Sequence, residues 1–183
     1  MTNFKVINNK ENRGKGAVVK QGMLEAKGDY RIFMDADNSV SIDVLDTMLP
    51  LTSTYQVVIA SIGVEGAQKV GHEPFYRRLL GKLGNLFIQL LAVPGIHDTQ
   101  RGFKLFTAKA AAEVFPRMHV AGWGFDVGAL AIARKMGYNI KEVPVSWNND
   151  PSSKVNIWAY PQVLLETIKI RWNLLSGVYD LRV

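Results

Sequence analysis

Short apolar runs alternate along the chain with longer segments in which apolar residues recur at helical spacing. The runs are too short for helices and several are rich in β-branched and aromatic residues, so they predict buried strands. The predicted strands cover residues 4–7, 30–34, 55–61, 102–106 and 139–145. The predicted helices cover residues 15–27, 42–49, 75–93, 108–115, 125–136 and 158–175, and polar loops cover 63–72 and 147–154. Strands that alternate with helices in this way predict an α/β layered fold.

The composition fits one globular domain over residues 1–183. Hydrophobic residues make up 48% of the chain, which is enough for a sizeable core. The absence of cysteine excludes disulfides, thiolate metal sites and a cysteine nucleophile. Lysine and arginine number 22 against 16 aspartates and glutamates, so the formal charge of +6 suits a phosphate-rich partner or an anionic membrane surface. We expect no membrane-spanning helix, because no uninterrupted apolar stretch approaches about 20 residues.

An acidic loop follows the predicted strand at residues 30–34. Asp35 and Asp37 offer hard oxygen ligands of the kind that bind Mg²⁺ or Mn²⁺ together with substrate phosphates. The same residues also suit an ordinary turn at the end of a strand, in which aspartate caps the next helix. Taken alone, the acidic loop leaves both interpretations open.

Two further segments carry polar groups that a ligand would explain. Residues 12–16 place two glycines and two cations before a helix, where backbone N–H groups and the helix dipole favour an anion. A plain glycine turn with solvated charges is an equal alternative there. Residues 98–104 (DTQRGFK) combine an acid, an amide, cations and a glycine just before a strand. Such a density of polar groups at a buried edge requires a partner.

The order and spacing of four segments resemble those of family 2 glycosyltransferases. The segments are residues 12–16, 35–37, 98–106 and 123–126, and the resemblance covers nearly the whole chain. Residues 98–107 carry the most specific part, which is similar to dolichyl-phosphate and polyprenyl-phosphate sugar synthases, especially their glucosyl branch. Residues 123–126 (WGFD) resemble the Trp-x-Phe-Asp signature of the family, and residues 153–154 (SK) resemble its Ser-Lys loop.

This resemblance implies a fold, a donor and a cofactor. The fold would be of GT-A type, a Rossmann-like mixed sheet flanked by helices, and the activity an inverting transfer of a hexose from a UDP or GDP sugar. Asp35 and Asp37 would hold Mg²⁺ or Mn²⁺, which neutralises the charge on the departing diphosphate. Lys15 and Gly16 would also bind the donor.

The resemblance also assigns roles around the reacting centre. We expect Asp98 to lie near that centre as the catalytic candidate. Asp126 is expected to cap a helix and, together with Gln100 and Trp123, to support the site.

The implied acceptor is a polyprenyl or dolichyl phosphate at a membrane surface. Arg77, Arg78 and Lys154 are expected to bind the acceptor phosphate, because guanidinium groups suit phosphate oxygens. A solvated basic helix face, or a contact with anionic lipid, remains the alternative for the two arginines. The helix at 75–93 is apolar over more than one face, so it could dock on a bilayer or fill the core. We therefore expect a peripheral protein at the cytoplasmic face of a membrane.

The sequence also departs from the family pattern. Ser39, Ile62 and Gly128 stand where the nearest branch usually carries a glutamine, an arginine and a glutamate. Ile62 cannot contact phosphate, and Gly128 removes a carboxylate. The first strands of the family fold, which hold the base and ribose, are not recognisable at the start of this sequence. On that basis we expect the chain alone to bind donor weakly or not at all, and a tight measured affinity for a nucleotide sugar would refute this expectation.

Three other functional interpretations are considered for the same residues. A degenerate glycosyltransferase-like domain that binds lipid phosphate or a partner subunit is the main alternative. A phosphatase of the haloacid dehalogenase type also uses Asp-x-Asp after a strand, but it needs a second acidic pair, and Asp-Asp is absent. A nucleic-acid partner is not expected, because the basic residues do not interleave with aromatics.

Overall fold

The computed structural model describes residues 4–70, 75–148 and 159–180, without the side chains of Tyr76 and Arg77. The helices are α1 (Lys15–Glu25), α2 (Val44–Met48), the 3-10 helix η1 (Leu49–Ser53), α3 (Phe75–Leu91), α4 (Ala108–Arg117), α5 (Phe125–Lys135) and α6 (Ala159–Leu175). The strands are β1 (Tyr30–Met34), β2 (Val57–Ser61), β3 (Gln68–Val70), β4 (Phe103–Thr107), β5 (Ile140–Pro144) and β6 (Ser146–Asn148).

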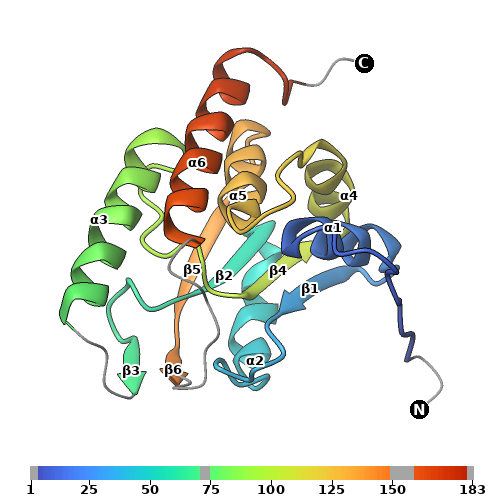
Figure 1. Cartoon of the computed structure of the whole chain (residues 1–183). Helices are drawn as coiled ribbons and strands as arrows, with labels where there is room; N and C mark the ends of the chain where they lie inside the picture. The colour runs from blue at the N-terminus through green and yellow to red at the C-terminus, as the bar shows by residue number, and fades with distance from the viewer. Residues whose placement is uncertain (1–3, 71–74, 149–158, 181–183) are drawn as a thin grey trace.

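Four of the strands form a mixed sheet in the order β1-β4-β2-β5. Strand β4 runs antiparallel to both of its neighbours, whereas β2 and β5 are parallel, so β1, β2 and β5 all point the same way. Strands β3 and β6 form a separate small parallel pair. The predicted α/β class and the mixed sheet flanked by helices are confirmed (Figure 1).

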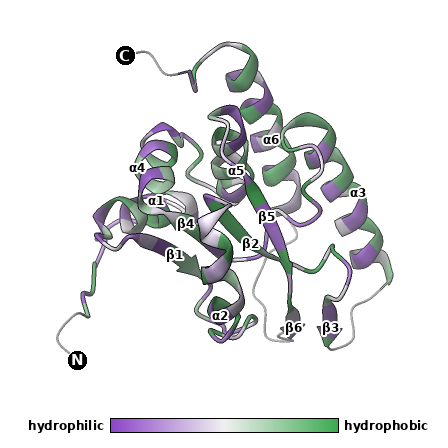
Figure 2. Ribbon diagram, turned by 180° about the vertical axis from the view of Figure 1, so that it is seen from behind, coloured by the Kyte–Doolittle hydropathy of each residue, from purple (hydrophilic) through white to green (hydrophobic). Residues whose placement is uncertain are grey.

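Both faces of the sheet are buried. Val57 and Ile59 of β2 face a large core that α4 and α5 share, while Val58 and Ala60 face a smaller core under α2 and η1. Because successive side chains of a strand point to opposite faces, a strand buried on both sides must be apolar throughout. Strand β2 meets this requirement, and it is coloured as hydrophobic in the middle of the sheet (Figure 2).

The predicted elements agree with the structure except at three places. Residues 4–7 form no strand, since they have no ladder partner among the described residues and Phe4 and Val6 are exposed. The expected loop 63–72 contains β3, and the start of the expected loop 147–154 belongs to β6. These strands have three residues each and pair only with each other, so the sequence contains no apolar run from which they could be predicted.

Candidate active site

The described polar segments meet at one edge of the sheet. Strand β1 ends there, and the antiparallel β4 begins there, because Met34 pairs with Phe103. The Asp35 N–H donates a hydrogen bond of 2.7 Å to the Gly102 carbonyl and so joins the acidic loop to the 98–104 segment. Ligands of open α/β sheets bind at the carboxyl ends of the strands, which is where this edge lies.

A cavity of about 270 Å³ opens at this edge. It is lined by Lys15, Asp35, Asp37, Ser39, Val40, Gln100, Arg101, Gly102, Phe103, Trp123, Asp126, Trp147, Ala159, Tyr160 and Val163. The lining therefore combines acids, cations and aromatic rings from α1, the loop after β1, the loop before β4, the start of α5, β6 and α6. Of the residues expected to bind donor or metal, the structure brings Lys15, Asp35 and Asp37 together here.

Asp35 is held from two sides. Lys15 Nζ lies 2.6 Å from Asp35 Oδ1, and the same ammonium lies 5.4 Å from the centre of the Trp123 ring. A side chain at Gly102 would collide with the Asp35 carboxylate, so glycine is required for this close approach. Lys15 thus contacts the acidic loop directly, and Trp123 steadies the lysine by a cation–π contact.

Asp37 sits in a tight turn. Its Oδ1 accepts a 3.0 Å hydrogen bond from the Ser39 N–H, and Asn38 adopts a left-handed φ of 54°, which asparagine tolerates better than most residues. The other oxygen, Oδ2, has no protein partner in the described part of the chain. The turn therefore presents a carboxylate to the cavity.

The donor set fits a hard divalent cation that shares its coordination with phosphates. Within the described residues there is no group of three or more His, Cys, Asp or Glu that could hold a metal by itself. Mg²⁺ at nucleotide sites commonly uses one or two carboxylates and completes its shell with phosphate oxygens and water. Asp37, together with Asp35, would provide those carboxylates.

Asp126 forms a buried ion pair and does not cap a helix. The position before α5 is Gly124, with no side-chain cap, whereas Asp126 Oδ1 accepts a 2.6 Å hydrogen bond from Lys104 Nζ. Burial raises the pKa of Asp126, while Lys104 opposes that rise. The expected capping role was wrong, because Lys104 projects from β4 into the core and requires an anion there.

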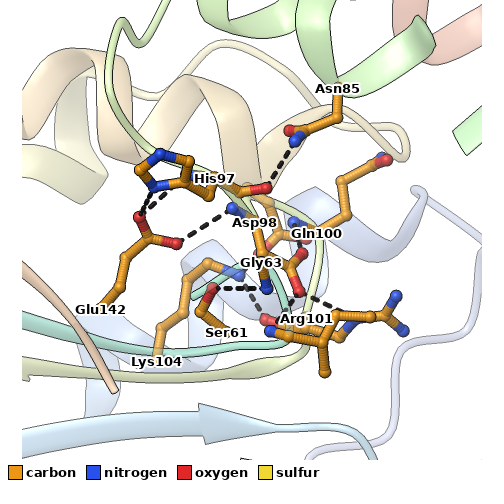
Figure 3. A network of polar contacts seen from close by, with 11 residues as sticks. Ser61, Gly63, Asn85, His97, Asp98, Gln100, Arg101, Lys104 and Glu142 are labelled. Carbon is orange, nitrogen blue, oxygen red and sulfur yellow. Dashed lines mark hydrogen bonds and ion pairs between the residues drawn. The ribbon is translucent and has the colours of Figure 1, made fainter. Parts of the chain in front are cut away.

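Asp98 lies behind the cavity lining. Its carboxylate accepts hydrogen bonds from the Ile62 N–H (3.0 Å), the Gln100 N–H (3.3 Å) and Arg101 Nε (3.1 Å). Its own N–H donates to Glu142 Oε1 of β5 at 3.0 Å (Figure 3). All of these contacts hold the loop, and Asp98 is not among the residues that line the cavity, so its expected place near the reacting centre stays a prediction.

Gly16 also has a packing role. Its N–H donates a 2.8 Å hydrogen bond to the Ala121 carbonyl, and an added Cβ would lie 2.6 Å from Val120 O and from Phe125 Cβ. Since this N–H is already bonded and Gly16 is outside the cavity lining, the expected contact between Gly16 and donor is not supported. The glycine instead lets α1 pack closely against the segment before α5.

Of the three residues expected to bind the acceptor phosphate, only Arg78 is fully described, and it does not line the cavity. Arg78 is exposed on α3, with its guanidinium 5.8 Å from the Phe75 ring centre. The Arg77 side chain and Lys154 lie outside the described residues. Gln100 lines the cavity as expected.

The three departures from the family pattern leave the cavity formed. Ser39 lines it and donates to Asp37 through its backbone. Ile62 contributes its backbone N–H to Asp98. Gly128 is buried in α5 outside the cavity lining, where an added Cβ would meet Val120, Ile170 and Met118 in ordinary contact.

Sequence reasoning missed Arg101, Lys104, Trp147 and Tyr160 as individual site residues. Arg101 and Lys104 belong to a segment that was recognised for its polar density, which was the available signal. Trp147 and Tyr160 come from β6 and α6, and only the tertiary structure brings them to the acidic loop.

A mixed α/β sheet with a pair of acids and cations at its carboxyl edge defines a class of protein that binds phosphate-bearing ligands. Residues 2–115 match the family described as glycosyl transferase family 2. The chain belongs to this family, and its sheet is that of a GT-A, Rossmann-like fold.

Curated relatives match over almost the whole chain. A dolichyl-phosphate beta-glucosyltransferase of Trichomonas vaginalis is 34% identical over 98% of this chain and 55% of its own length. Enzymes of the same name from Dictyostelium discoideum and Homo sapiens are each 32% identical, over 99% and 97% of this chain. These matches cover 58% and 57% of the two relatives, so the chain spans little more than half the length of the relatives it matches.

Proposed function

We propose that this chain carries the catalytic cavity of an inverting hexosyltransferase that moves a hexose from a nucleotide sugar to dolichyl or polyprenyl phosphate. The donor is of the UDP-glucose or GDP-mannose type. The observation that carries the proposal is the cavity in which Lys15, Asp35 and Asp37 meet at the carboxyl edge of a GT-A sheet. The names of the relatives support the choice of acceptor and of glucose.

The two acids of the acidic loop and Lys15 each have a role in this reaction. Asp37 and Asp35 would hold Mg²⁺ or Mn²⁺, which supplies positive charge to the departing diphosphate. Lys15 balances Asp35, because its ammonium lies 2.6 Å from Oδ1, and so limits the repulsion between two acids and an anionic donor. The acceptor is already an anion near neutral pH, so the reaction needs no strong general base.

A degenerate, non-catalytic domain is not favoured. Ser39, Ile62 and Gly128 leave the cavity and both acids in place. A phosphatase of the haloacid dehalogenase type is set aside, because the chain belongs to a glycosyltransferase family.

Transfer of radiolabelled hexose from UDP-glucose or GDP-mannose to polyprenyl phosphate tests the proposal. The assay should compare the 183-residue chain with a chimera in which it replaces the matching segment of the Dictyostelium discoideum relative. We expect Mn²⁺- or Mg²⁺-dependent transfer from one donor, which EDTA abolishes. Well-folded protein that transfers sugar from neither donor, alone or in the chimera, would contradict the proposed activity.

The acceptor requires access to a membrane, and two neighbouring helices offer a surface for it. Within the described residues, no helix is long and apolar enough to cross a bilayer. Helices α3 and α6 pack side by side (Figure 1), and each carries an exposed apolar stripe at helical spacing. The stripes consist of Leu79, Leu83, Leu86 and Leu90 on α3, and Leu165, Ile168, Trp172 and Leu175 on α6.

The charges beside these stripes suit an anionic bilayer. Helix α3 contains three cations and no acid in its sequence. On α6, Lys169 and Arg171 are exposed, and its one acid, Glu166, accepts a hydrogen bond of 2.6 Å from the Gly124 N–H. Tyr160 and Val163 of α6 also line the cavity, so the helix that carries this stripe also borders the site. This arrangement supports our proposal of a peripheral position at the anionic, cytoplasmic face of a membrane.

Vesicle binding tests this surface. Trp172 is 70% exposed and Leu83 is also exposed, and moving one such side chain from water into lipid is worth about 1.5–3 kcal/mol. We expect the double variant Leu83→Ser, Trp172→Ser to bind phosphatidylserine-containing vesicles about tenfold more weakly or worse. Leu24→Ser on α1 is the matched control and should bind normally. The surface would belong to another partner if the parent chain does not bind vesicles. The same would hold if the parent chain elutes as a dimer in size-exclusion chromatography and the double variant elutes as a monomer.

A further inference from the structure

Arg101 is fixed at the edge of the cavity by Asp98 of its own loop and by Trp147 of β6. Its Nε donates a 3.1 Å hydrogen bond to Asp98 Oδ2, and its guanidinium lies 4.2 Å from the centre of the Trp147 ring on β6. Arginine normally loses considerable side-chain freedom when it binds a ligand. Here two protein contacts already hold the guanidinium plane in place.

The support behind Arg101 is itself rigid. Asp98 accepts hydrogen bonds from two backbone N–H groups, those of Ile62 and Gln100, and donates its own N–H to Glu142 (Figure 3). Glu142 lies on β5, which pairs with β2 at one side of the sheet, and its carboxylate also accepts a 2.9 Å hydrogen bond from the His97 N–H. The sheet therefore holds Asp98 in place, and Asp98 in turn orients Arg101.

The outer end of Arg101 remains available to a ligand. Asp98 engages Nε, and within the described part of the chain the two Nη groups donate to no other protein atom. Arg101 and Trp147 both line the cavity, whereas Asp98 does not, and 26% of the Arg101 side chain stays exposed. The two Nη groups of Arg101 are thus available to a ligand in the cavity.

The charges of the cavity leave a place for an anion at Arg101. Asp35 is paired with Lys15, and Asp126 is paired with Lys104, so both of these acids are balanced. The Asp37 carboxylate and the Arg101 guanidinium then give the cavity a negative side and a positive side. A guanidinium stacked on an aromatic ring is weakly hydrated and presents a fork that matches two phosphate oxygens.

We propose that Arg101 is a phosphate-binding residue of this cavity and that Asp98 and Trp147 are its positioning residues. The inference rests on the proposed transferase function for the identity of the ligand, which is either the diphosphate of the donor or the phosphate of the lipid acceptor. It gives Asp98 a role through Arg101, without contact between Asp98 and the reacting atoms.

Calorimetric titration of the 183-residue chain, alone and within the chimera described above, with UDP plus Mg²⁺ and separately with undecaprenyl phosphate in detergent, tests the proposal. Loss of a hydrogen bond between charged groups predicts that Arg101→Gln weakens one of these ligands by about tenfold or more. The affinity of Arg101→Lys should lie between those of the parent chain and Arg101→Gln, because lysine keeps the positive charge but lacks the two-pronged guanidinium. Weaker UDP binding assigns Arg101 to the donor diphosphate, and weaker lipid-phosphate binding assigns it to the acceptor.

Asp98→Asn and Trp147→Leu test the positioning roles. Both should weaken the same ligand as Arg101→Gln, and adding either to Arg101→Gln should cause little further loss. Arg117→Gln, at the end of α4 and outside the cavity lining, is the matched control and should bind like the parent chain. Unfolding midpoints of all variants separate a binding defect from loss of structure.

Two outcomes would overturn the inference. One is parent-like affinity for both ligands, within twofold, in folded Arg101→Gln protein; the other is a parent chain that binds neither ligand, alone or within the chimera. A chain that binds phosphate through Arg101 and transfers no sugar in any form would contradict the transferase proposal and leave this inference standing. The two failures are therefore distinguishable.

Discussion

Replacing Asp37 with alanine is expected to reduce hexose transfer by about a hundredfold or more. A divalent ion contributes several kcal/mol to stabilising charge in a transition state, and each 1.36 kcal/mol is about tenfold in rate. Asp37 is the acid of the pair without a cationic partner among the described residues, whereas Asp35 is paired with Lys15. Loss of the Asp37 carboxylate should therefore remove most of the protein's affinity for the divalent ion. Transfer by the chain or its chimera, measured at saturating donor, gives the rate.

The metal readout does not depend on turnover. Mn²⁺ bound in the presence of UDP is measured by electron paramagnetic resonance, and we expect the bound fraction to fall in Asp37→Ala. Asp43→Ala is the matched control, because Asp43 lies in the same loop region but is exposed and outside the cavity lining. Unchanged Mn²⁺ binding and transfer in Asp37→Ala would show that the acidic loop is an ordinary turn, the alternative that the sequence left open.

The second large effect concerns the ion pair beneath the cavity. Lys104→Met is expected to destabilise the fold by about 3–5 kcal/mol, because it leaves the Asp126 carboxylate buried without its partner. The Lys104 and Asp126 side chains are 0% and 5% exposed, so the carboxylate has little contact with solvent that could compensate for the lost partner. Urea unfolding at neutral pH measures this loss. Lys109→Met on the exposed side of α4 should leave stability nearly unchanged.

The pH dependence of this variant follows from the direction of the Asp126 pKa. Burial raises the pKa of Asp126 in the folded protein, and removing Lys104 removes an influence that lowers it. A group with a raised folded-state pKa stabilises the fold below its unfolded-state pKa and loses that contribution as the pH rises through the folded-state value. The deficit of Lys104→Met should therefore be smallest near pH 4 and grow toward neutrality.

A double variant distinguishes the charge from the packing. Lys104→Met, Asp126→Leu removes both charges, and replacing a complete buried pair with apolar residues is often neutral or stabilising. We expect the double variant to recover most of the stability lost in Lys104→Met. A double variant as unstable as the single one would mean that side-chain shape, and not the uncompensated carboxylate, causes the loss.

The sequence predicted the regular elements well where the local pattern was strong. Strand β1 was placed at its observed bounds, and β2 was recognised by its continuous β-branched apolar run. The helices were found to within a few residues of their ends. Strands β3 and β6 were missed because a three-residue strand has no period to detect, and residues 4–7 were misplaced because an apolar run becomes a strand only where a partner is available.

The site was predicted by residue type more accurately than by role. Asp35, Asp37, Lys15, Gln100 and Trp123 were expected at the site and all line the cavity. Asp126 and Gly16 were assigned different tasks from those that their contacts indicate, and the place of Asp98 near the reacting centre stays a prediction. A carboxylate can cap a helix, hold a loop or neutralise a buried lysine, and the choice depends on neighbours that are distant in sequence.

By itself, the sequence determined the α/β class, the acidic loop at the end of β1 and the family resemblance, because each is encoded in contiguous residues. The tertiary structure alone decided which charges pair. Lys15 meets Asp35 across 20 positions, and Lys104 meets Asp126 across 22. It also decided that Arg101 rests on Trp147 from β6 and that α3 lies beside α6. These contacts depend on strand order and helix packing, which arise from the burial of the whole chain and not from any local pattern.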